Sequence, residues 1–195
     1  MRNLLLKCSR AVLGWPPRPA TFLEKQNLIS RLGREHGAKT FVETGTFLGE
    51  MIDAQRGQFE KLISIELAEE LFQAARKKYA ADPAVELVQG DSGVKLREVA
   101  ARLPEPALFW LDAHYSRGKT AGGHADAPII KELSGIAPRH QTRDLILIDD
   151  ARLFGLKSDY PKLAVIQNFA AQHWPQHTFA VDTDIICILP PRGNF

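Results

Sequence analysis

Residues 40–49 have the sequence Thr40-Phe41-Val42-Glu43-Thr44-Gly45-Thr46-Phe47-Leu48-Gly49. The first four residues predict a short strand, and Gly45 ends it. Glycines at this point allow a tight turn from a strand into a helix and let the backbone pass close to a ligand. Residues 51–58, which follow, predict a helix. The stretch therefore predicts a strand–turn–helix unit, the repeating unit of an α/β sheet.

The same alternation continues on both sides of this stretch. Apolar runs predict further strands at 62–65, 85–88, 107–111 and 145–148. Periodic apolar residues predict helices at 21–36, at 68–80, after a cap at Ser92, around 129–133 and from Pro161 onward. Residues 145–148 are apolar without a break, which indicates a strand buried on both faces. This alternation predicts a parallel sheet covered by helices on both sides.

The C-terminal pattern differs because two apolar runs stand close together. Residues 178–181 and 185–189 are separated only by Asp182-Thr183-Asp184. Such a short connection permits an antiparallel hairpin but no helical crossover. The predicted fold class is therefore α/β: a doubly wound, Rossmann-like sheet of about seven strands, mostly parallel, with a C-terminal antiparallel hairpin strand.

Length and charge limit the organisation and the partners. The chain has 195 residues, and 25 Lys and Arg against 23 Asp and Glu give it a net charge of +2. We expect a basic N-terminal lead-in segment, residues 1–20, followed by a single domain, residues 21–195. The balanced charge argues against nucleic acid as a partner. No apolar run approaches the roughly 20 residues that cross a bilayer, so we expect no stable membrane span.

The two cysteines, Cys8 and Cys187, stand at opposite ends of the chain. Their number and spacing predict neither a disulfide framework nor a metal site, which favours a reducing compartment such as the cytoplasm. Cys187 lies inside an apolar run, so we expect it to fill space in the core.

Acidic residues stand at the ends of all five predicted parallel strands. They are Glu43, Glu66, Asp91, Asp112 and the pair Asp149-Asp150. In a doubly wound sheet these positions share the edge at which ligands bind. The glycine spacing is neither the G-x-G-x-x-G of dinucleotide-binding proteins nor that of a phosphate-binding loop. Glu43 would repel a pyrophosphate but could receive an amino group, and Glu66 suits the hydroxyls of a ribose.

Together these segments resemble class I S-adenosylmethionine-dependent methyltransferases. The segments are Glu43–Gly49, Ile65-Glu66, Gly90-Asp91-Ser92, Leu111-Asp112 and Ile148-Asp149-Asp150. The resemblance implies that Glu43 and Gly49 and the backbone of Gly45 and Thr46 hold the methionine part of the cofactor. It also implies that Glu66 binds the ribose hydroxyls. The segment Gly90-Asp91-Ser92 would border the adenine.

Within that family, the sequence is most similar to the metal-dependent O-methyltransferases of the catechol and macrocin types. These carry one Asp after the fourth strand and an Asp-Asp or Asp-Asn pair after the fifth. The likeness implies that Asp112, Asp149 and Asp150 hold Mg²⁺ or a similar divalent cation. Neighbouring carboxylates repel one another unless a cation neutralises them, and Mg²⁺ prefers carboxylate and water oxygens.

The resemblance also implies catalytic roles for His114 and Asp112. His114 stands where macrocin-type enzymes carry a general base, and an imidazole with a pKa of about 6.5 suits removal of a proton from a hydroxyl. Tyr115 departs from the catechol pattern, which has a lysine there. The predicted function is methylation of a hydroxyl on a small, sugar-like or polyhydroxylated acceptor, and the chain could form a homodimer.

Simpler roles for these residues stay open on the sequence alone. Gly45 could serve packing, and Asp150 could cap a turn. Asp112 could bind a backbone N–H or the amino group of the cofactor without any metal, and His114 could be structural. Two other functions also stay open: a nucleotide-sugar or nicotinamide-dependent enzyme on a similar sheet, and a cofactor-binding domain without catalysis.

Overall fold

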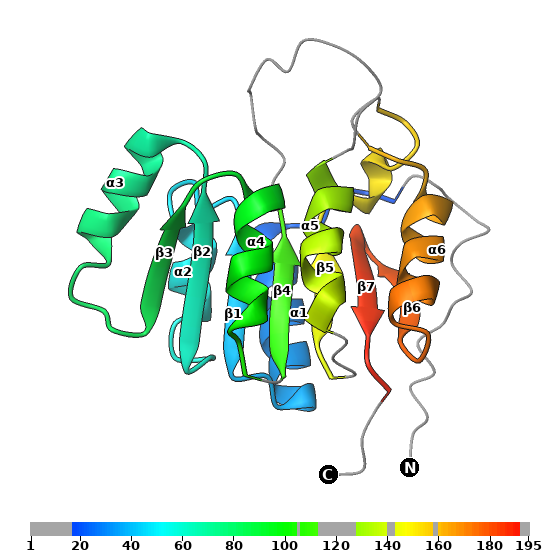
Figure 1. Cartoon of the computed structure of the whole chain (residues 1–195), viewed down its shortest axis with the longest axis horizontal. Helices are drawn as coiled ribbons and strands as arrows, with labels where there is room; N and C mark the ends of the chain where they lie inside the picture. Colours follow the sequence, from blue (N-terminus) through cyan, green and yellow to red (C-terminus); the bar gives the residue numbers. More distant parts are fainter. Residues whose placement is uncertain (1–16, 105, 113–127, 140–142, 158–159, 192–195) are drawn as a thin grey trace.

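Seven strands form one sheet in the part of the chain that the computed structural model describes (Figure 1). The structure describes residues 17–104, 106–112, 128–139, 143–157 and 160–191. The strands are β1 (Thr40–Thr44), β2 (Lys61–Glu66), β3 (Val85–Gln89), β4 (Ala107–Leu111), β5 (Leu145–Ile148), β6 (Thr178–Asp182) and β7 (Ile185–Leu189). Their order across the sheet is β3-β2-β1-β4-β5-β7-β6.

The strand pairing confirms the predicted fold class. Strands β1 to β5 are parallel to one another, and β7 pairs antiparallel with both β5 and β6. The chain winds outward from β1 through β2 to β3, and then returns to β4 on the other side of β1. A doubly wound sheet binds its ligand at such a reversal, beyond the carboxyl ends of the strands.

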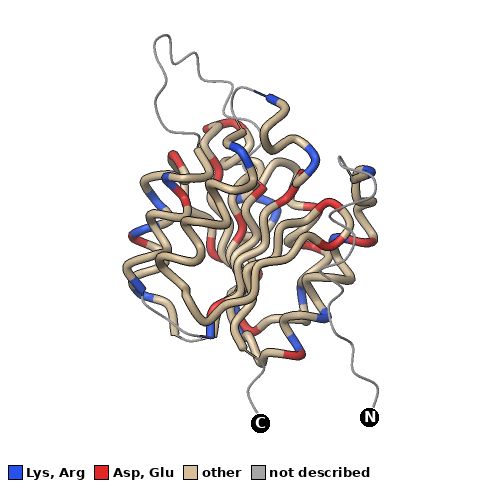
Figure 2. The backbone as a smooth tube through the Cα atoms, turned by 90° about the vertical axis from the view of Figure 1, so that its right-hand side faces the viewer, with Lys and Arg blue, Asp and Glu red and all other residues tan. Residues whose placement is uncertain are grey.

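Six α-helices of the described chain cover the two faces of this sheet. They are α1 (Phe22–His36), α2 (Glu50–Gln55), α3 (Glu69–Lys78), α4 (Ser92–Ala101), α5 (Pro128–Ile136) and α6 (Leu163–His173). Helices α1 to α3 share one buried cluster with the sheet, and α4 to α6 share another. Figure 2 shows the strands in the middle, with helices on either side. The last helix begins at Leu163, two residues after the predicted start at Pro161.

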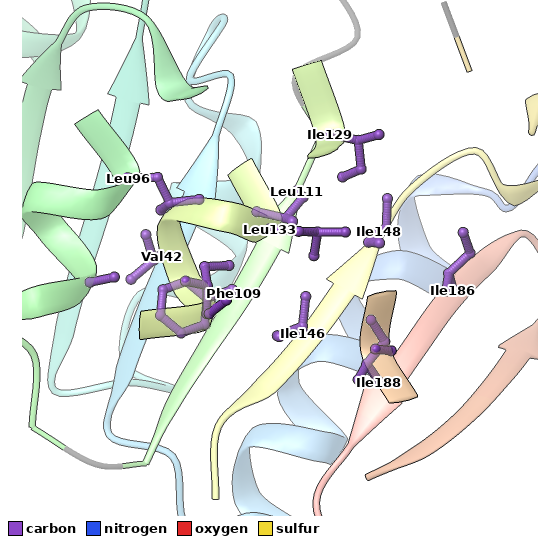
Figure 3. Packing of buried hydrophobic residues seen from close by; sticks show 14 of the residues in the cluster. Val42, Leu96, Phe109, Leu111, Ile129, Leu133, Ile146, Ile148, Ile186 and Ile188 are labelled. Carbon is purple, nitrogen blue, oxygen red and sulfur yellow. The ribbon is translucent and has the colours of Figure 1, made fainter. Parts of the chain in front are cut away.

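Successive side chains of the central strands point to opposite faces of the sheet and so form two separate cores. In β4, Phe109 packs with Leu96 of α4 and Leu133 of α5 on one face, as Figure 3 shows. The next residue, Trp110, belongs to the other core, which contains Ile29 of α1. All five of these side chains are at most 1% exposed, so both faces of the central strands are buried. This pattern is typical of parallel strands between two helical layers.

Helix α1 has defined ends that match its predicted limits. Thr21 and Glu24 form a capping box, in which the Thr21 hydroxyl accepts from the Glu24 backbone N–H at 3.3 Å. Gly37 ends the helix in the left-handed conformation, with φ of 65°. These two ends set the length of α1 and fix which residues lie in its first turn.

The predicted division into a lead-in segment and one domain stays a prediction. Residues 1–16, most of the lead-in segment, lie outside the described residues. Among the helices that the structure describes, none combines the length and the apolar character needed to cross a membrane. Cys187 is buried as expected, and burial raises the pKa of its thiol to about 12.

Two substitutions on α4 test the assignment of its buried face. Leu96 is fully buried between α4 and the sheet, whereas Val94 is 59% exposed on the same helix. Leu96→Ala should lower the free energy of unfolding by about 2–5 kcal/mol because it opens a cavity. Val94→Ala, the matched control, should change it by less than about 0.5 kcal/mol. Urea denaturation of both variants measures the difference, and equal effects would contradict the assigned face.

Candidate functional site

The acidic residues predicted from the sequence meet at one edge of the sheet. We call this the acidic edge and define it by Glu43, Glu66, Asp91, Asp112, Asp149 and Asp150. Backbone bonds tie neighbouring strand ends together there: the N–H of Asp149 donates to Leu111 at 3.1 Å, and that of Gly90 donates to Glu66 at 2.9 Å. Figure 2 shows several acidic segments at this upper end of the strands. The expected juxtaposition of the strand ends is therefore confirmed.

The turn between β1 and α2 has a backbone shape that requires glycine. Gly45 and Gly49 have φ of 87° and 75°, and Phe47 between them has φ of 48°. A Cβ on Gly49 would lie 2.3 Å from the hydroxyl oxygen of Tyr79, which itself donates to the Gly49 carbonyl at 2.7 Å. Both the conformation and the close packing therefore exclude a larger residue at position 49.

Glu66 connects this turn to the end of β2. One carboxylate oxygen accepts from the Phe47 backbone N–H at 3.0 Å, and the other accepts from Ala68 at 2.8 Å. The residue is 7% exposed. Glu66 therefore holds the turn against the neighbouring strand, at the place predicted for the ribose of a cofactor.

Glu43 belongs to a buried polar chain beneath the same turn. The Ser64 hydroxyl donates to Glu43 at 2.6 Å, and the Thr46 hydroxyl lies 2.6 Å from the Ser64 hydroxyl. Burial raises the pKa of Glu43 to about 8; the Ser64 hydrogen bond opposes this shift, and the charges of Asp112 and Glu66 add to it. Glu43 is consequently protonated for the most part at pH 7 in the free protein.

The segment after β3 is held by one helix cap and by a hydrogen bond to α5. Asp91, and not Ser92 as the sequence suggested, is the N-cap of α4, because its extended backbone lets its carboxylate accept from Gly93 N–H at 2.8 Å. Ser92 instead donates to Glu132 of α5 at 2.6 Å. Gly90 has φ of 139°, a conformation that side chains disfavour.

The acids after β4 and β5 have partners within the chain. The Asp112 backbone N–H donates to the Thr44 hydroxyl at 3.2 Å. Asp149 is fully buried, and one of its carboxylate oxygens accepts from the Asp150 backbone N–H at 2.8 Å while the other contacts the Lys25 ammonium. Asp150 pairs with Arg152 at 2.5 Å, and its backbone is left-handed, with φ of 55°.

Lys25 is a site residue that sequence reasoning missed. It lies in the first turn of α1, and its side chain is 18% exposed. Burial lowers the pKa of Lys25, but the hydrogen bond to Asp149 and the negative charges of Asp149, Asp112 and Asp150 outweigh burial and raise it. Lys25 is therefore a fixed positive charge at neutral pH. Nothing in the spacing of the α1 residues distinguishes this lysine from a solvated one.

Two further neighbours of the acidic edge were also missed. Arg152 contacts both Asp150 and Asp184, and Asp184 is fully buried. Tyr160 packs edge-on against Phe154, with ring centroids 5.3 Å apart. Burial and the charges of Asp150, Asp112 and Asp149 raise the pKa of the Tyr160 phenol, so the phenol stays protonated.

The predicted metal ligands do not form a metal-binding group in the described chain. Among the described residues, no three His, Cys, Asp or Glu side chains are arranged so that they could hold a metal ion. Lys25 takes one oxygen of Asp149, and Arg152 pairs with Asp150. Asp112, Asp149 and Asp150 as placed here therefore do not fit a divalent cation. His114 lies outside the described residues, so its predicted role as a base stays a prediction.

The protonated state of Glu43 predicts an unusual pH dependence of stability. The pKa of Glu43 is about 8 in the folded state and 4.5 in the unfolded state. Between pH 4.5 and pH 8 the folded protein therefore binds more protons than the unfolded protein. The contribution of Glu43 to stability consequently falls as pH rises through this range. Glu43→Gln removes this loss. The difference in free energy of unfolding, Glu43→Gln minus wild type, should therefore be larger at pH 8 than at pH 5 by more than about 1 kcal/mol.

Urea denaturation at both pH values measures this difference. Glu70→Gln, which changes an exposed carboxylate on α3, is the control and should follow wild type. Parallel stability curves for Glu43→Gln and wild type would contradict a raised pKa at Glu43.

Comparisons with known proteins show which solved structures share this fold. No protein-family model matches the chain, and no curated protein matches its sequence. Among solved structures, the chain is similar to the S-adenosylhomocysteine (SAH)-bound methyltransferase PaMTH1 of Podospora anserina, with a TM-score of 0.61, 17% identity, and coverage of 88% of this chain and 80% of that one.

Two further solved structures are similar over comparable lengths. The O-methyltransferase TomG of Streptomyces achromogenes, in complex with S-adenosylmethionine, gives a TM-score of 0.55 at 17% identity, covering 88% of this chain and 82% of that one. An O-methyltransferase of Bacillus cereus in complex with SAH gives a TM-score of 0.56 at 15% sequence identity, covering 89% of this chain and 84% of that one. The chain therefore has the fold of these methyltransferases.

Proposed function

We propose that this protein transfers a methyl group from S-adenosylmethionine to a hydroxyl of a small molecule. The observation that carries the proposal is the acidic edge itself. A glycine turn and six acidic residues meet beyond the strands where the sheet reverses its winding, between β1 and β4. The three solved structures with a similar fold are described as methyltransferases with S-adenosylmethionine or SAH bound. Their likeness supports the proposal at the level of the fold.

The residues at the edge suit the parts of this cofactor. Glu66 lies beside the glycine turn, and its carboxylate can accept from ribose hydroxyls. Glu43, with Gly45, Thr46 and Gly49, would hold the methionine part. Gly90, Asp91 and Ser92 would border the adenine.

Asp112 would face the amino group of the cofactor's methionine part. An ammonium brought close to Glu43 would lower its pKa and favour the carboxylate form. Cofactor binding would thereby release a proton from Glu43.

When bound, the cofactor supplies a methyl group on a positively charged sulfur. The residues of the chain have two tasks in the reaction. The carboxyl groups of the acidic edge would hold the positively charged cofactor in place. His114, with Asp112, would remove the proton from the acceptor hydroxyl. The mechanism contains no step through a divalent cation, because Asp112, Asp149 and Asp150 as arranged do not fit one.

The remaining parts of the proposal concern partners and location. A hydroxyl acceptor of sugar-like or polyhydroxylated character suits a polar edge with many hydrogen-bonding groups. The proposed setting is the cytoplasm, with a homodimer as the proposed assembly. The balanced charge of the chain supports a protein without a nucleic acid partner.

Binding of SAH tests the cofactor assignment. Wild-type protein should bind SAH in isothermal titration calorimetry. Glu66→Ala should weaken binding at least about tenfold, or about 1.4 kcal/mol, because it removes a charged acceptor from the ribose site. Glu70 is exposed on α3, so Glu70→Ala should bind SAH with the affinity of wild type.

Two outcomes would contradict the cofactor assignment. A wild-type protein without measurable binding of SAH overturns the proposed function. Equal affinity of Glu66→Ala and wild type removes the ribose-binding role of Glu66. A thermal melt of each variant without ligand separates loss of binding from loss of folding.

A further inference from the structure

Two basic side chains lie at the position where the sequence predicts a metal ion. Lys25 of α1 contacts Asp149 after β5, although 124 positions separate them in the chain. Arg152 contacts Asp150, which follows Asp149 directly. The two acids that follow β5 are therefore both paired with cations of the same chain.

The contact between Lys25 and Asp149 is largely removed from water. The Asp149 side chain is 0% exposed and that of Lys25 is 18% exposed. A buried carboxylate is costly unless a cation and hydrogen bonds satisfy it. The second oxygen of Asp149 accepts from the Asp150 backbone N–H at 2.8 Å. Both oxygens of Asp149 are thus bound by groups that the chain supplies.

The ammonium of Lys25 also acts on the other two predicted ligands. The negative charges of Asp112 and Asp150 both stabilise it, in addition to that of Asp149. An ammonium is a compact charge with three donors, which suits a position among several carboxylates. Lys25 thereby reduces the mutual repulsion of three acids, which is the electrostatic task of a divalent cation at such a site.

Helix α1 holds Lys25 firmly at this position. The capping box of Thr21 and Glu24 fixes the start of the helix, and the Lys25 backbone N–H donates to the Thr21 carbonyl at 3.1 Å. Leu28 and Ile29, one turn further along, are buried against the sheet. The lysine is therefore carried by a packed helix and not by a loose segment.

We propose that the Lys25 ammonium is the resident cation of the acidic edge and takes the place of a divalent metal ion. Lys25 is a positioning residue, because it holds the carboxylate of Asp149 and neutralises its neighbours. Its consequence for catalysis rests on the proposed methyltransferase function: methyl transfer needs no added divalent cation. Its consequence for stability and metal binding does not depend on that function.

Thermal melts with EDTA, MgCl₂ or MnCl₂ test the proposal on the full chain. Wild-type protein should melt at the same temperature in all three. Lys25→Met, of similar length but uncharged, should melt at least about 5 °C lower in EDTA, because Asp149 stays buried without its cation. Mg²⁺ or Mn²⁺ should then restore part of this loss, because the Asp149 oxygen that Lys25 occupies becomes available to a metal. Lys25→Arg should keep most of the stability without metal.

A matched control separates this effect from a general loss of charge. Lys39 forms an exposed pair with Glu60 at 2.9 Å, so Lys39→Met should show neither the loss of stability nor the response to metal. Lys25→Met that is destabilised but insensitive to divalent cations would overturn the proposal. Stabilisation of wild-type protein by Mn²⁺ would also overturn it, and this measurement stays decisive if Lys25→Met does not fold.

The catalytic consequence has its own readout. Once an acceptor supports methyl transfer, wild-type activity should be unchanged when EDTA replaces MgCl₂. Activity that EDTA abolishes would overturn the role of Lys25 but leave the methyltransferase function intact. Complete failure to bind SAH would instead overturn the function and leave the melting results to decide the role of Lys25.

Discussion

Burial of both faces of the central strands is the constraint on which the rest of the structure depends. Strands β4 and β5 direct alternate apolar side chains into two separate cores, so neither face has room for a charged group. Polar chemistry is thereby confined to the strand ends. Because β1 to β5 are parallel, their carboxyl ends lie on one side, and the acids at those ends must meet there.

Six acidic residues can share one edge because the chain stabilises them in different ways. Burial favours the protonated form of Glu43, whereas Glu66 accepts two backbone N–H groups. Asp91 accepts a hydrogen bond at the start of α4, and Lys25 neutralises Asp149. The same residue types therefore have different partners and tasks within a few strand ends, and the surroundings of each side chain decide which it has.

The sequence allowed the fold to be predicted because its signals are local. Continuous apolar runs indicate buried strands, and the short connection near residue 183 leaves room for a hairpin but not for a helical crossover. The gathering of the acids follows from that topology. The partners of those acids were not predictable, because the lysine that binds Asp149 lies 124 positions away. Apolar periodicity shows which face of α1 is buried, but it does not show which strand end Lys25 of that helix reaches.

Because Lys25 belongs to α1, the charge at the acidic edge depends on the position of that helix. A bound metal exchanges with the solution, so its supply sets the charge of such a site. A lysine cannot dissociate, and the charge that it brings is present whenever the helix is docked. With Lys25 as the cation, loosening of α1 from the sheet would expose an uncompensated Asp149. The position of one packed helix would then govern the electrostatic potential of the edge, independently of ion concentrations around the protein.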